Sequence, residues 1–77
     1  MKQITTIATV EVVKKIKNSA FGNPAYEVRI ETADKVIYGR TAPNAMCSYM
    51  LWHGFSAERK ISYHKTSSGR TYLDYIY

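Results

Sequence analysis

Few residues of this chain have side chains that perform chemistry, and their spacing matches no catalytic or metal-binding motif. The chain has two histidines, His53 and His64, and one cysteine, Cys47. Metal sites built from these residue types need three or four ligands at characteristic spacings. Ser62, His64 and Asp74 form a triad on paper, but such trios arise by chance and a triad is defined by its geometry. We therefore expect no catalysis, no metal and no other cofactor.

Cys47 and the glycines are better explained by structure than by chemistry. Cys47 lies inside the apolar segment 41–54, where a free cysteine acts as a small buried hydrophobe. No base is fixed beside it to generate a reactive thiolate. The four glycines are scattered along the chain, so they form no phosphate-binding loop.

The remaining side chains with chemical potential are basic and aromatic, which indicates binding. The formal net charge is +5, and the chain contains seven Tyr, two Phe and one Trp. Lysine and arginine neutralise phosphates, and an exposed ring that stacks on a nucleobase contributes about 1–3 kcal/mol. A basic balance also suits an anionic membrane surface or an acidic protein partner.

Length and composition place limits on the class of protein. Seventy-seven residues make one domain, residues 1–77, and the apolar share of 45% is that of a folded chain. One cysteine cannot form an internal disulfide, whereas small secreted domains usually depend on several. The first residues lack the apolar run of a signal peptide, and no segment reaches the roughly 20 apolar residues that span a bilayer. We therefore expect a cytoplasmic protein with no membrane partner.

Five segments have the composition of β-strands. Residues 5–17 are rich in β-branched side chains, and their alternation slips at residues 13–16, as at a β-bulge. Residues 25–32 alternate apolar and polar side chains most clearly, and they form a predicted hairpin with residues 35–40. The last two predicted strands are residues 59–65 and 70–77.

One helix is expected around residues 43–53. Pro43 suits the first turn of a helix, and Gly54 suits the left-handed residue that ends one. Ala45, Tyr49 and Trp52 recur at the spacing of one helical face. The predicted fold is mainly β, a small β-barrel or an α+β layer, with five antiparallel strands in the order β-β-β-α-β-β.

This order, with a long and bent first strand, resembles the OB-fold, a five-stranded Greek-key barrel. The resemblance covers the whole chain as topology and rests on the strand segments and the predicted helix. The alternative is an open antiparallel sheet packed on one helix. The stretch from Asn18 to Pro24, followed by Tyr26-Glu27-Val28, also resembles in style the short basic proteins of bacteriophages and mobile elements.

The OB resemblance implies a ligand on the face of the second and third strands, between the loops that join strands one to two and four to five. Glu27 and Glu31 share that face with Arg29 and would repel phosphates. Phe21, in the first loop, either covers the core or stands exposed as a stacking ring. The resemblance implies a nucleic-acid-binding site made of Phe21, Arg29, Tyr38, Arg40, Lys65 and Arg70.

The expected function is therefore non-catalytic binding of single-stranded DNA or RNA. The alternative is a small interaction or inhibitor protein, encoded by a phage or mobile element, that binds a host protein through its tyrosine-rich surface. A basic groove lined with rings would favour nucleic acid, whereas a flat Tyr/Met patch would favour a protein. A third alternative is a homodimer formed through the C-terminal strand, if residues 71–77 leave an open edge.

Overall fold

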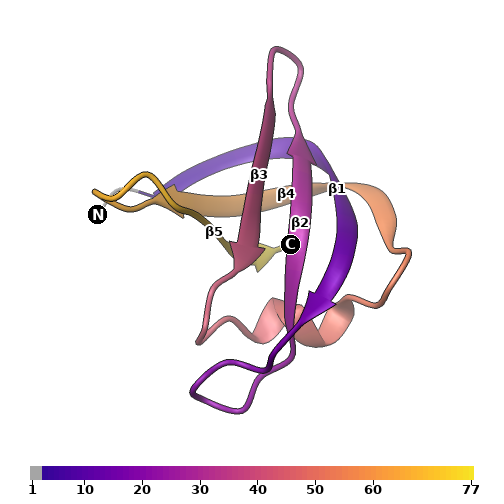
Figure 1. The fold of residues 1–77 in the computed structure, drawn as a ribbon. Coiled ribbons are helices and arrows are strands. Elements are labelled where there is room, and N and C mark those ends of the chain that lie inside the picture. Colours follow the sequence, from indigo (N-terminus) through magenta and orange to yellow (C-terminus); the bar gives the residue numbers. More distant parts are fainter. Residues whose placement is uncertain (1–2) are drawn as a thin grey trace.

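The computed structural model describes residues 3–77 and shows a closed barrel of five strands (Figure 1). Around the barrel the strands follow the order β1-β2-β3-β5-β4, and β1 pairs with β4 to close the ring. The predicted mainly-β barrel is confirmed, and the open sheet is wrong. The elements are β1 (Gln3–Ile16), β2 (Ala25–Glu31), β3 (Val36–Thr41), the 3-10 helix η1 (Met46–Met50), β4 (Ser56–Lys65) and β5 (Thr71–Ile76).

The prediction of an entirely antiparallel sheet is wrong at one pair of strands. β3 and β5 run parallel, with Arg40 opposite Tyr72 and Thr41 opposite Leu73. A closed ring with an odd number of strands cannot alternate direction at every step, so five strands require at least one parallel pair. Parallel neighbours need a long connection, and η1 together with β4 supplies it.

The helix predicted over residues 43–53 is also wrong in type and length. Only Met46–Met50 is helical, as a 3-10 helix between two extended residues, and no side chain caps its start. Cys47 is buried whereas Tyr49 and Trp52 are exposed, so the row that includes Tyr49 and Trp52 does not face the core. The apolar segment instead covers one end of the barrel with a single short turn, because tertiary contacts override weak helix propensity.

The first strand serves two sides of the barrel. Its first part pairs with β4 and its second part pairs with β2. The register with β2 shifts between Val12 and Lys14, which confirms the predicted bulge. A bulge bends a strand and increases its twist, so β1 can turn the corner that closure requires.

The interior of the barrel is apolar and well separated from solvent. Along β1, Ala8, Val10 and Val12 point inward and are buried. Residues that follow η1 complete the core, with Leu51 and Phe55 packed against the strands. The side chains with no exposed surface at the centre are Val10, Val28, Ile30, Ile61 and Leu73.

β5 hydrogen-bonds to β4 on one side and to β3 on the other. Its pairing with β3 covers Tyr72 and Leu73 only. An edge for a second copy of the chain is therefore restricted to the residues after Leu73, and the homodimer through the C-terminal strand stays a prediction.

Gly39 lies where β5 approaches β3 most closely. A Cβ atom added at Gly39 would lie 2.6 Å from the carbonyl oxygen of Thr71. Such a contact is far inside van der Waals distance, so only glycine fits while β5 keeps its place. Glycine within a strand often marks a close backbone approach, and here it permits the pairing that closes the barrel.

We predict that Gly39→Ala destabilises the protein. In an ordinary strand, alanine in place of glycine stabilises by about 0.5–1 kcal/mol. Here the clash with Thr71 should instead lower the free energy of unfolding by about 1–3 kcal/mol, as overpacking does. Urea unfolding followed by circular dichroism measures the sign. A variant as stable as the wild type, or more stable, would show that β5 can move away from β3.

Candidate functional site

A groove of about 350 Å³ lies over β3, beside the start of β5. We name it the central groove. The outward positions of β3 on its floor are Tyr38, opposite Arg29 of β2, and Arg40, opposite Glu27 of β2. The residues that line it are Val13, Glu27, Val28, Tyr38, Gly39, Arg40, Gly69, Arg70, Thr71 and Tyr72.

Three of the six predicted site residues meet in the central groove: Tyr38, Arg40 and Arg70. Tyr38 is 68% exposed, so its ring is available to a ligand. Arg40 and Arg70 are exposed as well, and across residues 3–77 neither guanidinium makes a hydrogen bond or an ion pair. They are far apart in sequence, and the parallel pairing of β3 with β5 brings them to one groove.

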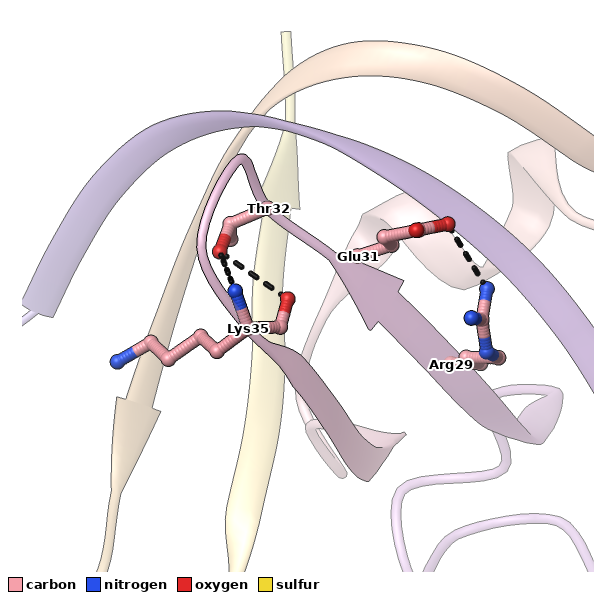
Figure 2. Close-up of polar contacts among 4 residues, drawn as sticks. All are labelled: Arg29, Glu31, Thr32 and Lys35. Atoms are coloured by element: carbon pink, nitrogen blue, oxygen red, sulfur yellow. Dashed lines mark hydrogen bonds and ion pairs between the residues drawn. The ribbon is translucent and has the colours of Figure 1, made fainter.

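Arg29 is a weaker candidate than the sequence indicated. Its Nη1 donates to Glu31 Oε1 over 3.1 Å, along the same strand (Figure 2). This hydrogen bond is the main reason that the pKa of Arg29 is raised above its ordinary value. Arg29 does not line the central groove. Its positive charge is compensated by Glu31, and Glu31 in turn is neutralised.

Glu27 is the one carboxylate that lines the central groove. The Nζ of Lys14 lies 3.9 Å from Glu27 Oε2, because Lys14 and Glu27 are partners in the register of β1 with β2. The repulsion that the sequence indicated between the strand face and phosphates is therefore reduced at Glu27 by Lys14 and at Glu31 by Arg29.

Phe21 stands apart from the groove. It lies in the loop between β1 and β2 and is 72% exposed, so the alternative in which it covers the core is wrong. Ser19 Oγ and Asn23 Nδ2 both donate to the carbonyl of Pro43, at 2.8 and 3.1 Å. These bonds hold the loop at the end of the barrel near η1 (Figure 1).

A second groove of about 420 Å³ lies in the fork where β3 and the β4–β5 turn diverge. We name it the fork groove. It contains Lys65, a predicted site residue, and Lys35, which the sequence reasoning missed. Lys35 directly follows the turn of the predicted hairpin. This position was the signal in the sequence that could have identified it. The lining residues are Ile4, Lys35, Val36, Ile37, Tyr38, Tyr63, Lys65, Gly69 and Thr71.

The triad of Ser62, His64 and Asp74 that the sequence suggested does not form in the structure. His64 Nδ1 lies 2.6 Å from Asp74 Oδ2, in a pair that bridges β4 and β5. Ser62 Oγ hydrogen-bonds with Thr5 Oγ1 and with the hydroxyl of Tyr77. Over the described part of the chain, no hydrogen bond joins Ser62 to His64. This cluster cross-links three strands at the surface of the barrel.

Residues 3–77 contain neither a candidate metal site nor a candidate membrane-spanning helix. No group of three or more His, Cys, Asp or Glu side chains is close enough to hold a metal ion within this range. The same residues include no helix long and apolar enough to cross a membrane.

Comparisons with known proteins identify no relative: no family model, no curated protein and no solved structure matches the chain.

Cys47 is buried, as the sequence predicted, with 4% of its surface exposed. Burial raises the pKa of its thiol to about 11, and the negative charge of Asp74 acts in the same direction. At neutral pH the group is therefore a protonated thiol, which is a poor nucleophile.

We predict that Cys47 makes stability fall in alkaline solution. An unfolded cysteine has a pKa of about 8.5, so the folded state binds the proton more tightly. The resulting stabilisation is complete below about pH 8.5 and is lost as the pH rises toward 11, by about 3 kcal/mol. The measurement is the difference in free energy of unfolding between the wild type and Cys47→Ala from pH 7 to 11. A difference that does not change with pH would contradict the prediction.

Proposed function

We propose that this chain is a single-stranded nucleic-acid-binding protein whose barrel is of the OB type. The closed ring of five strands in the order β1-β2-β3-β5-β4 supports this assignment. The bulged first strand and the single short turn between β3 and β4 also support it. OB barrels bind oligonucleotides and oligosaccharides on the face of the second and third strands, beside the loop between strands four and five. The central groove lies in that place.

The main observation behind the proposal is that two arginines without partners share one groove with exposed aromatic surface. Arg40 and Arg70 line the central groove with Tyr38 and Tyr72. Single strands need positive charge along their backbone and rings for their bases. A duplex hides its bases from such rings, so the arrangement favours a single strand. The net charge of +5 would add long-range attraction.

We predict that Arg40→Ala combined with Arg70→Ala weakens oligonucleotide binding by about tenfold or more, because two phosphates lose their counter-charges. The measurement is fluorescence anisotropy of labelled single-stranded DNA and RNA at about 50 and 200 mM salt. The slope of log affinity against log salt should fall by about 1.4, or 0.7 for each lost phosphate contact.

The matched control is Arg59→Ala combined with Lys60→Ala. It removes the same charge from exposed positions on β4 that line neither groove. Equal effects of the two double variants would show that overall charge, and not the central groove, determines binding. Wild-type protein that binds no oligonucleotide at low salt would refute the proposed function.

The second candidate function is binding of a protein partner, and a different surface supports it. Tyr49 donates from its hydroxyl to Asn23 Oδ1 over 3.1 Å, which ties η1 to the loop that contains Phe21. Large apolar side chains gathered at a surface are typical of protein interfaces. We name this surface the apolar end. It consists of Phe21, Met46, Tyr49, Met50 and Trp52, each between 48% and 72% exposed. For a phage or mobile-element protein, the partner would be a host protein.

Under this second function, we predict that Met46→Gln combined with Met50→Gln abolishes capture of the partner. Glutamine keeps the length of methionine and removes its apolar character, so the barrel should remain folded. The measurement is affinity capture from a cell extract with the wild type and both double variants. If Arg40→Ala/Arg70→Ala lost capture of the partner and the methionine variant retained it, the result would contradict this prediction. The partner would then bind at the central groove and not at the apolar end.

A further inference from the structure

We infer that the single strand bound in the central groove continues into the fork groove, where Lys35 and Lys65 contact its backbone phosphates. This inference rests on the proposed function and deepens it, because it assigns a second subsite and a minimum ligand length. The fork groove would take one end of an oligonucleotide, with nucleobases on its apolar floor and phosphates at its two lysines.

The two grooves adjoin. Tyr38, Gly69 and Thr71 line both of them. The ring of Tyr38 is 68% exposed, so it stands at the junction as a surface on which a base can stack. A ligand in the central groove therefore reaches the edge of the fork groove at these shared residues.

Among residues 3–77, the charged residues that line the fork groove are both positive. They are Lys35 and Lys65, whereas the central groove also includes Glu27. Among residues 3–77 neither ammonium has a hydrogen bond or an ion pair, in contrast to Lys14, which lies near Glu27. The fork groove therefore has two cations available for an anionic ligand.

The hairpin turn fixes the backbone of Lys35 while leaving its side chain unbound. The N–H of Lys35 donates to Thr32 Oγ1 over 3.2 Å. The same hydroxyl lies 2.9 Å from Asp34 Oδ1, so the nearest carboxylate in the turn is bound to Thr32. Figure 2 shows the Lys35 side chain extended away from the hairpin, with no contact drawn to its ammonium. The backbone of Lys35 is therefore fixed while its ammonium is free, which suits a contact with a phosphate.

The floor of the fork groove is suited to a nucleobase. Ile4 and Val36 line it, and each is 43% exposed. Covering large β-branched side chains on the outside of a barrel with a flat apolar surface removes them from water, which is favourable in free energy. A nucleobase that lies over Ile4 and Val36 would cover their exposed apolar surface. The lysines on either side would then contact the phosphates next to it.

The distance along the backbone from Lys35 to Arg40 sets the minimum length of the ligand. Lys35 and Arg40 are five positions apart, which corresponds to about 17 Å at about 3.3 Å per strand residue. Stacked nucleotides advance about 3.4 Å each, so about five are needed to reach from one cation to the other. This length is within the range of site sizes of OB barrels, about 4–16 nucleotides.

The test compares oligothymidylates of about 3 and about 10 nucleotides, titrated by anisotropy against the wild type and Lys35→Ala/Lys65→Ala. For the longer ligand, we expect the variant to bind about tenfold more weakly, with a salt slope lower by about 1.4. For the shorter ligand, which fits in the central groove alone, the two proteins should bind alike. Lys35→Arg/Lys65→Arg keeps the charge and should bind both ligands as the wild type does.

The outcomes separate this inference from the proposed function. Equal binding of the longer ligand by the wild type and Lys35→Ala/Lys65→Ala would overturn the fork-groove inference and leave the central groove in place. The same loss with both ligand lengths, or with Arg59→Ala/Lys60→Ala, would also overturn it, because the effect would then be one of general charge. No binding of either ligand by the wild type at low salt would refute the proposed function and this inference together.

Discussion

The parallel contact between β3 and β5 is the constraint on which the rest of the structure depends. Five strands cannot close into a ring without one parallel pair, and here that pair is short, at Arg40–Tyr72 and Thr41–Leu73. The absence of a side chain at Gly39 allows the backbone of Thr71 to come close enough. Beyond this short contact, β3 and the β4–β5 turn diverge, and the fork groove lies between them beside the central groove.

The distribution of charge follows from the strand register in the same way. The pairing of β1 with β2 places Lys14 opposite Glu27, and the alternation of β2 places Arg29 and Glu31 on one face. His64 and Asp74 are joined by a hydrogen bond of 2.6 Å across β4 and β5. These pairs are partly exposed and add little to stability. Four cations without an ion pair within residues 3–77 line the two grooves, namely Lys35, Arg40, Lys65 and Arg70, whereas Arg59 and Lys60 line neither.

Sequence reasoning found the strands because period-two alternation and turn residues are local signals. The OB resemblance predicted Tyr38, Arg40 and Arg70 as site residues, and the structure places all three in one groove because the β4–β5 turn lies beside β3. Sequence reasoning failed at the helix, since the apolar row of Ala45, Tyr49 and Trp52 suits a helix, but only Met46–Met50 is helical and Tyr49 and Trp52 are exposed. Arg29 does not line the central groove, and its ion pair with Glu31 depends on rotamers that the sequence does not show.

For the proposed function, the lining of the grooves indicates which kind of nucleic-acid recognition is physically reasonable. Direct reading of bases needs donors and acceptors held in a fixed orientation, such as the amides of Asn and Gln or a guanidinium held by a carboxylate. Neither groove is lined by Asn or Gln, and Arg40 and Arg70 have no partner within the described residues to hold their planes. Tyrosine rings stack on any base, and free cations follow any phosphate backbone. Under the proposed function, these features therefore favour binding that tolerates many sequences.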